Sequence, residues 1–206
     1  MNESSTTKVF FFVKSGNEEN MKFDPLVKVA ENRLFKISDG SEINLSGLNV
    51  VQADSVDASC IPSDGVVTAV VCSWSKIEME PGSYNEDLLA KLRDYLKSLE
   101  ENGRFAFIVP VADSKIEDAD QADSFVSAMV HAARRIKDAE SVVGFAIPSV
   151  FAEKDSGKAL DDNSYCQWFI NEMNKKHGHY VYLIEKSLVE KFSVEPKTVS
   201  NELVVY

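Results

Sequence analysis

Polar side chains with acid–base or sugar-binding chemistry follow several apolar segments of this sequence. Carboxylates can act as acid, base or nucleophile at an acetal carbon, and an indole face stacks on the apolar face of a pyranose ring. The residues that come after such segments are Gln52, Asp54, Ser73, Trp74, Asp113, Ser149, Glu153 and Glu185. If the segments are parallel strands, these side chains share one rim, and carboxylates beside a tryptophan are what a sugar site needs.

Other interpretations of the same residues are open. The chain has 33 Asp and Glu residues against 22 Lys and Arg, so carboxylates fall in most loops by chance and are then solvated. Trp74 can pack against the helix that follows it instead of facing a ligand. Trp168 is a further candidate for sugar stacking, but it lies within a predicted helix, where packing is expected.

Composition and motifs exclude several classes of protein. A net charge of −11 argues against nucleic-acid binding, and no apolar run approaches the roughly 20 residues of a membrane span. The cysteines Cys60, Cys72 and Cys166 are odd in number and too widely spaced for a disulfide framework or a zinc site. The sequence has no phosphate-binding glycine loop and no nucleophile-elbow motif, and we expect no cofactor. The histidines His177 and His179 alone do not make a metal site, so we expect no metal.

The elements that must position the polar residues follow from hydrophobic patterning. Asp39-Gly40 separates two alternating segments, which predicts an antiparallel β-ribbon over residues 26–46. Residues 1–25 are interpreted as a tail with one short strand at Val9–Val13. After Gly47, strands are predicted at 48–53, 66–72, 104–111, 142–147, 180–184 and 202–206, and helices at 85–102, 123–138, 164–176 and, for a turn or two, 187–192.

This alternation of strands and helices predicts a parallel sheet covered by helices. The segments Asp113–Gln121 and Glu153–Asn163 are interpreted as loops that follow strand ends. A flavodoxin-like open sheet is an alternative fold, although the leading ribbon and the lack of a phosphate-binding loop count against it.

Four short motifs occur in a fixed order along the first part of the chain. They are Asp39-Gly40 with Leu45, Gly47 and Asn49, then Trp74 after a strand, then Glu80-Pro81-Gly82-Ser83-Tyr84-Asn85, then Glu101-Asn102-Gly103. In this order and spacing, Leu34 to Phe151 resembles the N-terminal half of a clan A glycoside hydrolase, the group that holds the family 5 endoglucanases and mannanases. The resemblance implies a barrel fold, a polysaccharide or oligosaccharide partner and a secreted protein, whereas Met1–Ser5 does not look like the start of a secretory signal.

The sequence departs from that family where catalysis would occur. The family's fourth strand ends in Asn-Glu-Pro with Glu as general acid, and the resemblance places Ser149 and Val150 at these positions. Val150 cannot donate a proton, and the family's nucleophile lies on a seventh strand. The chain after Gly47 has room for five or six β/α units and not for eight.

We therefore predict an α/β fold, an incomplete or reduced TIM-like (β/α) barrel of about five to six parallel strands preceded by an N-terminal β-ribbon. Residues 26–206 would form a single glycosidase-like domain, with the ribbon at 26–46 and the β/α units at 47–206.

Three hypotheses for function follow. The favoured one is a catalytically degenerate glycosidase-like domain that binds polysaccharide through Trp74, Asp54, Asp113 and Ser149. The second is an active glycoside hydrolase with a rearranged carboxylate pair, Glu153 and Glu185, and Asp113 as a third candidate. The third is an interaction or assembly module, because an incomplete barrel leaves open sheet edges that the ribbon, a protein partner or a second copy of the chain would cover.

Overall fold

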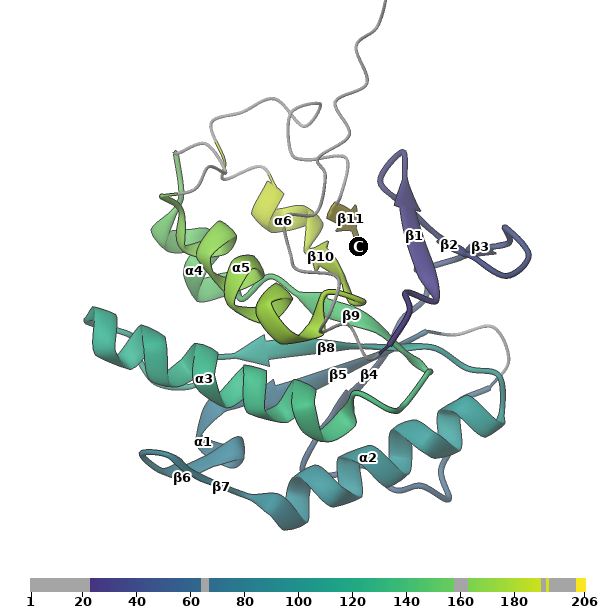
Figure 1. The fold of residues 1–206 in the computed structure, drawn as a ribbon, viewed down its shortest axis with the longest axis horizontal. Coiled ribbons are helices and arrows are strands. Elements are labelled where there is room, and N and C mark those ends of the chain that lie inside the picture. Colours follow the sequence, from purple (N-terminus) through teal and green to yellow (C-terminus); the bar gives the residue numbers. More distant parts are fainter. Residues whose placement is uncertain (1–22, 64–66, 158–162, 190–191, 193–202) are drawn as a thin grey trace, which may run out of the picture.

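The structure, a computed structural model, describes residues 23–63, 67–157, 163–189, 192 and 203–206. Its centre is a six-stranded parallel sheet with the spatial order β11-β10-β9-β8-β5-β4 (Figure 1). The strands are β4 (Asn49–Gln52), β5 (Thr68–Ser73), β8 (Ala106–Val111), β9 (Val142–Ala146), β10 (Val181–Ile184) and β11 (Leu203–Val205).

Each strand of the sheet pairs in parallel with the strand of the sheet that precedes it along the chain. This sequential order is that of a (β/α) barrel, whereas a flavodoxin-like sheet places its first strand in the interior. Among the described residues, β4 and β11 stand at opposite ends of the sheet, so the barrel is partial. The predicted fold is confirmed.

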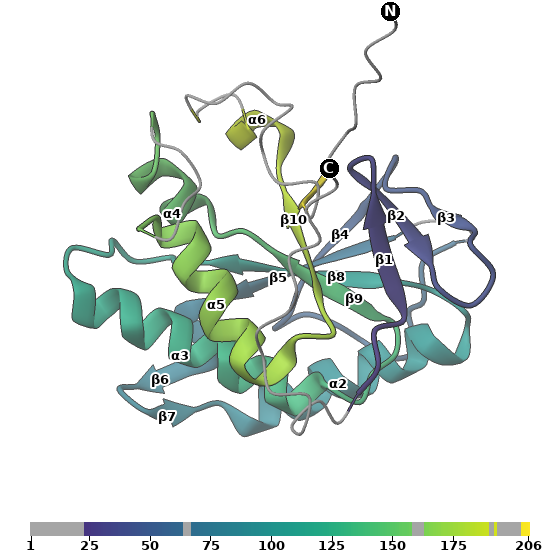
Figure 2. The same cartoon turned by 45° about the horizontal axis from the view of Figure 1, so that its top comes forward.

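Three helices cover one face of the sheet: α2 (Glu86–Glu101), α3 (Ala119–Ile136) and α5 (Tyr165–His177) (Figures 1 and 2). Their apolar stripes and the facing side chains of the strands form one continuous buried cluster, in which Leu92, Phe125 and Phe169 are fully buried. In a barrel, helices lie outside, so this face corresponds to the outer surface of the strands.

The N-terminal ribbon packs on the opposite face. It consists of β1 (Val27–Ala30), β2 (Arg33–Lys36) and β3 (Glu42–Ile43), which pair antiparallel as predicted. Leu34 and Ile43 of the ribbon belong to a second buried cluster with Phe107, Leu183 and Val204 of the sheet. The ribbon therefore covers part of the surface that would be the interior of a closed barrel.

The contact between β9 and β10 depends on a glycine. A Cβ atom at Gly144 would lie 1.9 Å from the carbonyl oxygen of Val181 on β10. A larger residue at this position would clash with the β10 backbone, so the absence of a side chain allows β9 and β10 to approach this closely.

Two loop predictions are wrong. Residues Ser149–Lys154 form helix α4 where a loop was expected from Glu153 onward. Pro148 stands at the N-cap position with φ −59°, close to the value that its ring fixes, and a helix begins directly after it. Helix α3 begins at Ala119, before the predicted 123, because the Asp118 side chain accepts a hydrogen bond from the backbone N–H of Gln121.

The structure also contains short elements that patterning did not predict: α1 (Trp74–Ile77) and the hairpin of β6 (Glu78–Glu80) and β7 (Ser83–Tyr84). Helix α6 (Lys186–Val189) is the short helix expected near 187–192. The predicted strand Val9–Val13 lies outside the described residues, and a single domain over 26–206 stays a prediction. Every helix in the described part of the chain is too short or too polar to cross a lipid bilayer.

Candidate functional site

The predicted site residues follow the carboxyl ends of neighbouring strands. Asp54 comes after β4, Trp74 after β5, Asp113 after β8, Ser149 after β9 and Glu185 after β10. Because the strands are parallel and in sequential order, these residues occur along one edge of the sheet in the same order. The structure gathers three of them around helix α1.

Asp113 and Asp54 both contact α1. The Asp113 carboxylate accepts hydrogen bonds from the backbone N–H of Ser75, at 3.1 Å, and from the Ser75 hydroxyl. The Asp54 carboxylate lies 3.6 Å from the Nζ of Lys76. These contacts tie the ends of β4, β5 and β8 to one another, and Asp113 satisfies a backbone donor in the first turn of α1.

Trp74 is held by a neighbouring carboxylate. Its indole N–H donates to Glu78 Oε2 at 2.5 Å, and the backbone N–H of Gly82 donates to Glu78 Oε1 at 2.7 Å. The Trp74 ring meets the ring of Phe125 edge to face, with centroids 5.7 Å apart. Trp74 thus packs against Phe125 of α3, a later helix than the one predicted to follow it at residues 85–102. It is only partly buried and also borders a cavity.

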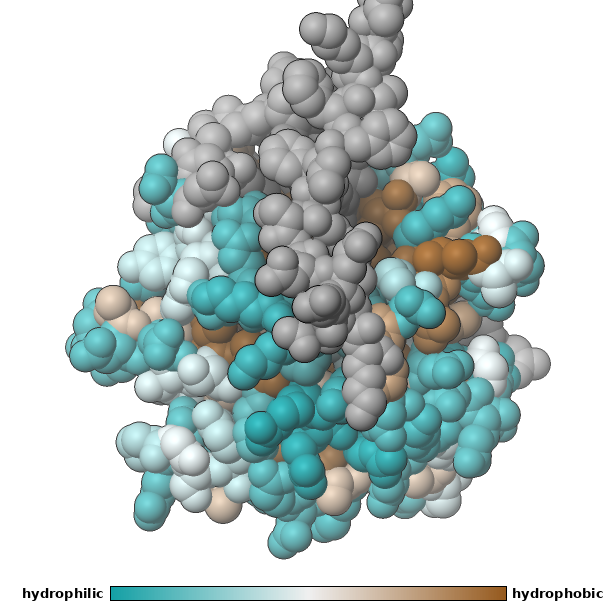
Figure 3. Space-filling model, in the orientation of Figure 1, coloured by the Kyte–Doolittle hydropathy of each residue, from teal (hydrophilic) through white to brown (hydrophobic). Residues whose placement is uncertain are grey.

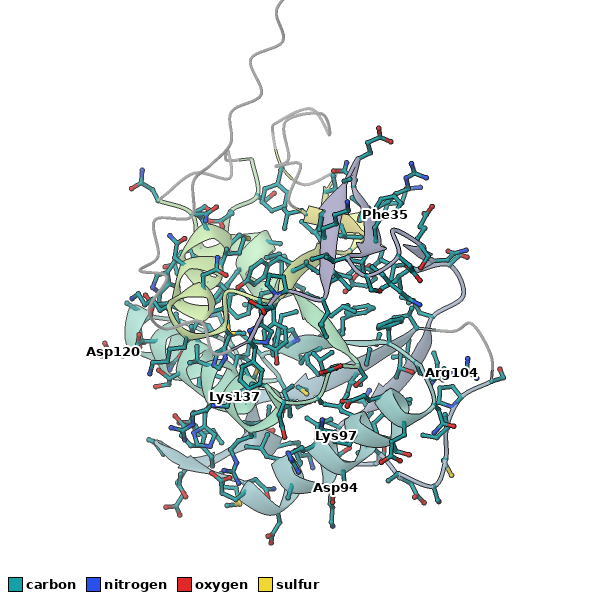
Figure 4. The ribbon with its side chains drawn as sticks, turned by 45° about the vertical axis from the view of Figure 1, so that its right-hand side comes forward. Phe35, Asp94, Lys97, Arg104, Asp120 and Lys137 are labelled. Atoms are coloured by element: carbon teal, nitrogen blue, oxygen red, sulfur yellow. The ribbon has the colours of Figure 1, made fainter. Side chains whose placement is uncertain are left out.

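This cavity, of about 360 Å³, lies between α1, the β6–β7 hairpin and the start of α3. Apolar surface comes from Trp74, Met79 and Pro81, and polar groups come from the side chains Ser75, Glu78, Glu80, Ser114, Asp120, Gln121 and Ser124. Asp120 extends from the beginning of α3 in Figure 4. An indole beside hydroxyl, amide and carboxylate groups can hold a polyol with an apolar face.

The end of β9 differs from the expected catalytic arrangement. Ser149 is exposed at the first position of α4, and Glu153 is exposed in its last turn. Val150 packs against the main hydrophobic cluster. Since α4 packs on α5 and α6, these residues belong to the β9–β10 side of the edge, apart from the group around α1.

Glu185 lies just before α6 and contacts that helix. Its Oε1 accepts a hydrogen bond from the Ser187 hydroxyl at 2.5 Å, and its side chain is exposed. Burial raises the pKa of Tyr206 to about 12, and the negative charge of Glu185 contributes to this increase. The backbone N–H of Lys186 donates to the carbonyl oxygen of Tyr206 at 2.9 Å, so the chain beside Glu185 meets the residue that follows β11.

Neither buried cysteine has the properties of a nucleophile. Burial raises the pKa of the Cys72 thiol to about 12 and also raises that of Cys166, so both are thiols rather than thiolates. The residues with defined positions contain no group of three or more His, Cys, Asp or Glu side chains arranged to hold a metal ion.

Three residues of this group, Ser75, Lys76 and Glu78, were not predicted from the sequence. One signal was present for Glu78, which stands four residues after Trp74, the spacing at which helical side chains meet. Trp168 lies 5.9 Å from the Phe151 ring and 6.4 Å from the Tyr165 ring, in the packing role expected of a helical tryptophan.

No protein-family model matches the sequence, and no curated protein matches it. Solved structures with a similar fold include an endogalactoceramidase, at 12% identity and TM-score 0.62 over 88% of this chain and 59% of that one. Endo-glycoceramidase II from Rhodococcus sp., solved as a lactosyl-enzyme intermediate, has 11% identity and TM-score 0.55 over 88% of this chain and 58% of that one. An endoglucanase has 15% identity and TM-score 0.50 over 68% of this chain and 47% of that one.

The chain thus spans less than two thirds of the length of each of these structures. At such low identity the likeness concerns the fold alone. The conclusion from the strand order and from the comparisons is that the chain has a glycoside-hydrolase-like, partial (β/α) barrel fold.

Proposed function

We propose that this chain is a glycoside-hydrolase-like domain without hydrolytic activity that binds an oligosaccharide in the cavity beside Trp74. The observation that carries the proposal is a difference between two groups of residues at the carboxyl ends of the parallel strands. Val150, where the family resemblance expects the general acid, is an apolar side chain packed on the core, whereas the Trp74 cavity combines an indole with hydroxyl, amide and carboxylate groups.

The absence of hydrolysis follows from the chemistry of acetal cleavage. Glycosidases need one carboxyl group to protonate the leaving oxygen and a second to act as nucleophile or base across the scissile bond. Val150 supplies no proton. Glu153 and Glu185 are exposed; Glu153 lies in the last turn of α4, and Glu185 directly precedes α6 and accepts a hydrogen bond from Ser187.

Binding is supported by the way Trp74 is fixed. Glu78 holds the indole N–H and is itself held by Gly82, so the ring has a defined orientation before any ligand arrives. A pyranose stacked on the indole would place its hydroxyls beside Ser75 and Gln121, which also border the cavity.

Tryptophan fluorescence can test the binding proposal, because the chain has 2 tryptophans. The variant Trp168→Phe leaves Trp74 as the only indole, and we expect cello- or manno-oligosaccharides to change its emission in a saturable way. The matched variant Trp74→Phe retains a ring against Phe125 and is expected to lose binding in calorimetry. Equal affinity of Trp74→Phe and wild type would contradict the proposed site.

A reducing-sugar assay tests the catalytic half of the proposal. We expect no turnover of glucan or mannan oligosaccharides by the wild type or by the double variant Glu153→Gln, Glu185→Gln. Turnover by the wild type that disappears in the double variant would instead establish an active hydrolase with a rearranged carboxylate pair.

Assembly through a sheet edge is a second candidate, and one observation favours it. Val50, on the edge strand β4, is 62% exposed, although it is an apolar side chain in a strand. If copies of the chain pair through this edge, light scattering will show an oligomer that Val50→Lys converts to a monomer. A strictly monomeric wild type at high concentration would contradict this function.

A further inference from the structure

A second cavity of about 360 Å³ lies in the groove between α3 and α5. Its apolar surface comes from Val126 and Val130 of α3. Its polar groups come from three elements: Tyr84 of β7, the α3 residues Asp123, Ser127, His131 and Arg134, and the α5 residues Glu172, Lys175 and Lys176. Helices α3 and α5 lie side by side in Figures 1 and 2.

A hydrogen-bonded network fixes Arg134 at this cavity. The His131 ring stacks on Tyr84 with centroids 3.9 Å apart, its Nε2 lies 2.8 Å from Glu86, and its Nδ1 lies 3.1 Å from the Arg134 guanidinium. A guanidinium can only donate, so Nδ1 accepts and the imidazole carries its proton on Nε2, which donates to Glu86. His131 therefore orients Arg134 and occupies only part of its donor capacity.

Some of the positively charged side chains around the cavity form ion pairs and others do not. Lys175 is paired with Glu172 at 2.5 Å, and Arg135, the neighbour of Arg134, is paired with Glu86 at 2.8 Å. Among the described residues, Arg134 and Lys176 make no ion pair. In a chain of net charge −11, these two cations lie at one cavity without an ion-pair partner among the described residues.

We propose that this groove binds a tetrahedral oxyanion, a phosphate or sulfate ester group, between Arg134 and Lys176. The planar guanidinium offers paired N–H donors that match oxyanion geometry, the lysine adds a second positive charge, and the Ser127 hydroxyl is a further donor. The proposal does not depend on oligosaccharide binding at Trp74.

The same cavity limits the ligand. Asp123 and Glu172 also border it and would repel additional negative charge, so a monoester is favoured over a polyphosphate. The apolar surface of Val126 and Val130 is available to the organic part of the ester.

The experiment is a titration followed by amide and arginine Nε resonances in NMR spectra. Inorganic phosphate and inorganic sulfate are added separately, with chloride at matched ionic strength as the baseline. We expect saturable shifts in α3 and α5 with at least one oxyanion and not with chloride. Saturation by phosphate alone or by sulfate alone assigns the corresponding ester class.

Matched variants identify the residues responsible. Arg134→Gln and Lys176→Gln should each weaken binding roughly tenfold or more, whereas Arg135→Gln should leave it unchanged. Both arginines lie in the last turn of α3, where a cation also favours the helix C-terminus. Equal effects of Arg134→Gln and Arg135→Gln, or equal shifts with chloride, would overturn the proposal. Lys176 is exposed, so its variant gives a decisive result even if Arg134→Gln fails to fold.

Discussion

Acidification should destabilise this fold through His177, the last residue of α5. This side chain is 2% exposed, and its burial lowers its pKa from 6.5 to about 4, with His179, Lys137 and Lys176 adding electrostatic repulsion. Since the folded-state pKa lies below the unfolded one, protons bind preferentially to the unfolded chain as pH falls. The stability that the fold has with a neutral His177 is fully present well above pH 6.5. The free energy of unfolding then falls progressively as pH drops below 6.5 toward the folded-state pKa of about 4.

The two pKa values set the magnitude. Between pH 7 and pH 5 the free energy of unfolding should fall by about 2 kcal/mol on account of this imidazole alone. Lys137, which lies near the end of α3 in Figure 4, is one source of the repulsion that lowers the pKa of His177.

Urea denaturation at pH 7, 6 and 5 provides the assay, applied to the wild type and to His177→Phe. Carboxylates that titrate near pH 5 affect both proteins equally, so the difference between the two pH profiles isolates His177. An NMR titration of the imidazole gives the folded-state pKa directly. Parallel profiles, or an imidazole that titrates near 6.5 in the folded protein, would refute the reasoning.

Three further substitutions have defined outcomes. Gly144→Ala should unfold the protein or lower its stability by roughly 3 kcal/mol or more, because the new Cβ meets the Val181 carbonyl, and circular dichroism on heating checks this. Asp118→Ala should cost about 1 kcal/mol through loss of the α3 cap, measured by urea denaturation, with Asp118→Asn close to wild type. Asp138→Asn should lower the free energy of unfolding by less than about 1 kcal/mol, because the exposed ion pair of Asp138 with Arg93 is screened by solvent. Hydrogen bonding from Arg93 lowers the pKa of Asp138, so the stabilisation is lost when this carboxylate is protonated. Urea denaturation of wild type and variant should therefore give converging stabilities as pH falls below about 4.

Helices and turns whose ends are fixed by neighbouring residues could be predicted from the sequence. Helix α2 begins where the Asn85 side chain accepts from the Leu88 N–H at 3.1 Å, and the chain leaves it at Gly103 with φ +66°. Both signals are visible in the sequence as Asn before an acidic first turn and Gly after the last apolar residue. The ribbon turn at Asp39-Gly40 is equally local, because Asp39 binds the Ser41 N–H at 2.8 Å.

The arrangement at the strand ends could be predicted only in part. Parallel topology placed Trp74 and Asp113 on one edge, but α1 depends on Asp113 reaching Ser75 across 38 residues of sequence, which no local pattern reveals. Likewise, Lys97 of α2 (Figure 4) donates to the backbone carbonyl of Asp138, in the loop after α3, and also to the Glu100 carboxylate. The contact with Asp138 joins residues 41 positions apart, so no local pattern reveals it. The sequence argument also had no means to show that His177 is buried and uncharged rather than a cation at the end of α5.

The ribbon has a consequence for biosynthesis. Its apolar residues Leu34 and Ile43 are buried partly against Leu183 and Val204, which come much later in the chain, and exposed Leu26 and Ile37 add to the apolar surface that Figure 3 shows over the ribbon. During synthesis these side chains lack the part of their binding surface that Leu183 and Val204 supply until β10 and β11 have been translated. During that interval the ribbon is a target for chaperones and proteases, and a ribosome that stalls before β11 would leave the ribbon without the contacts of Val204.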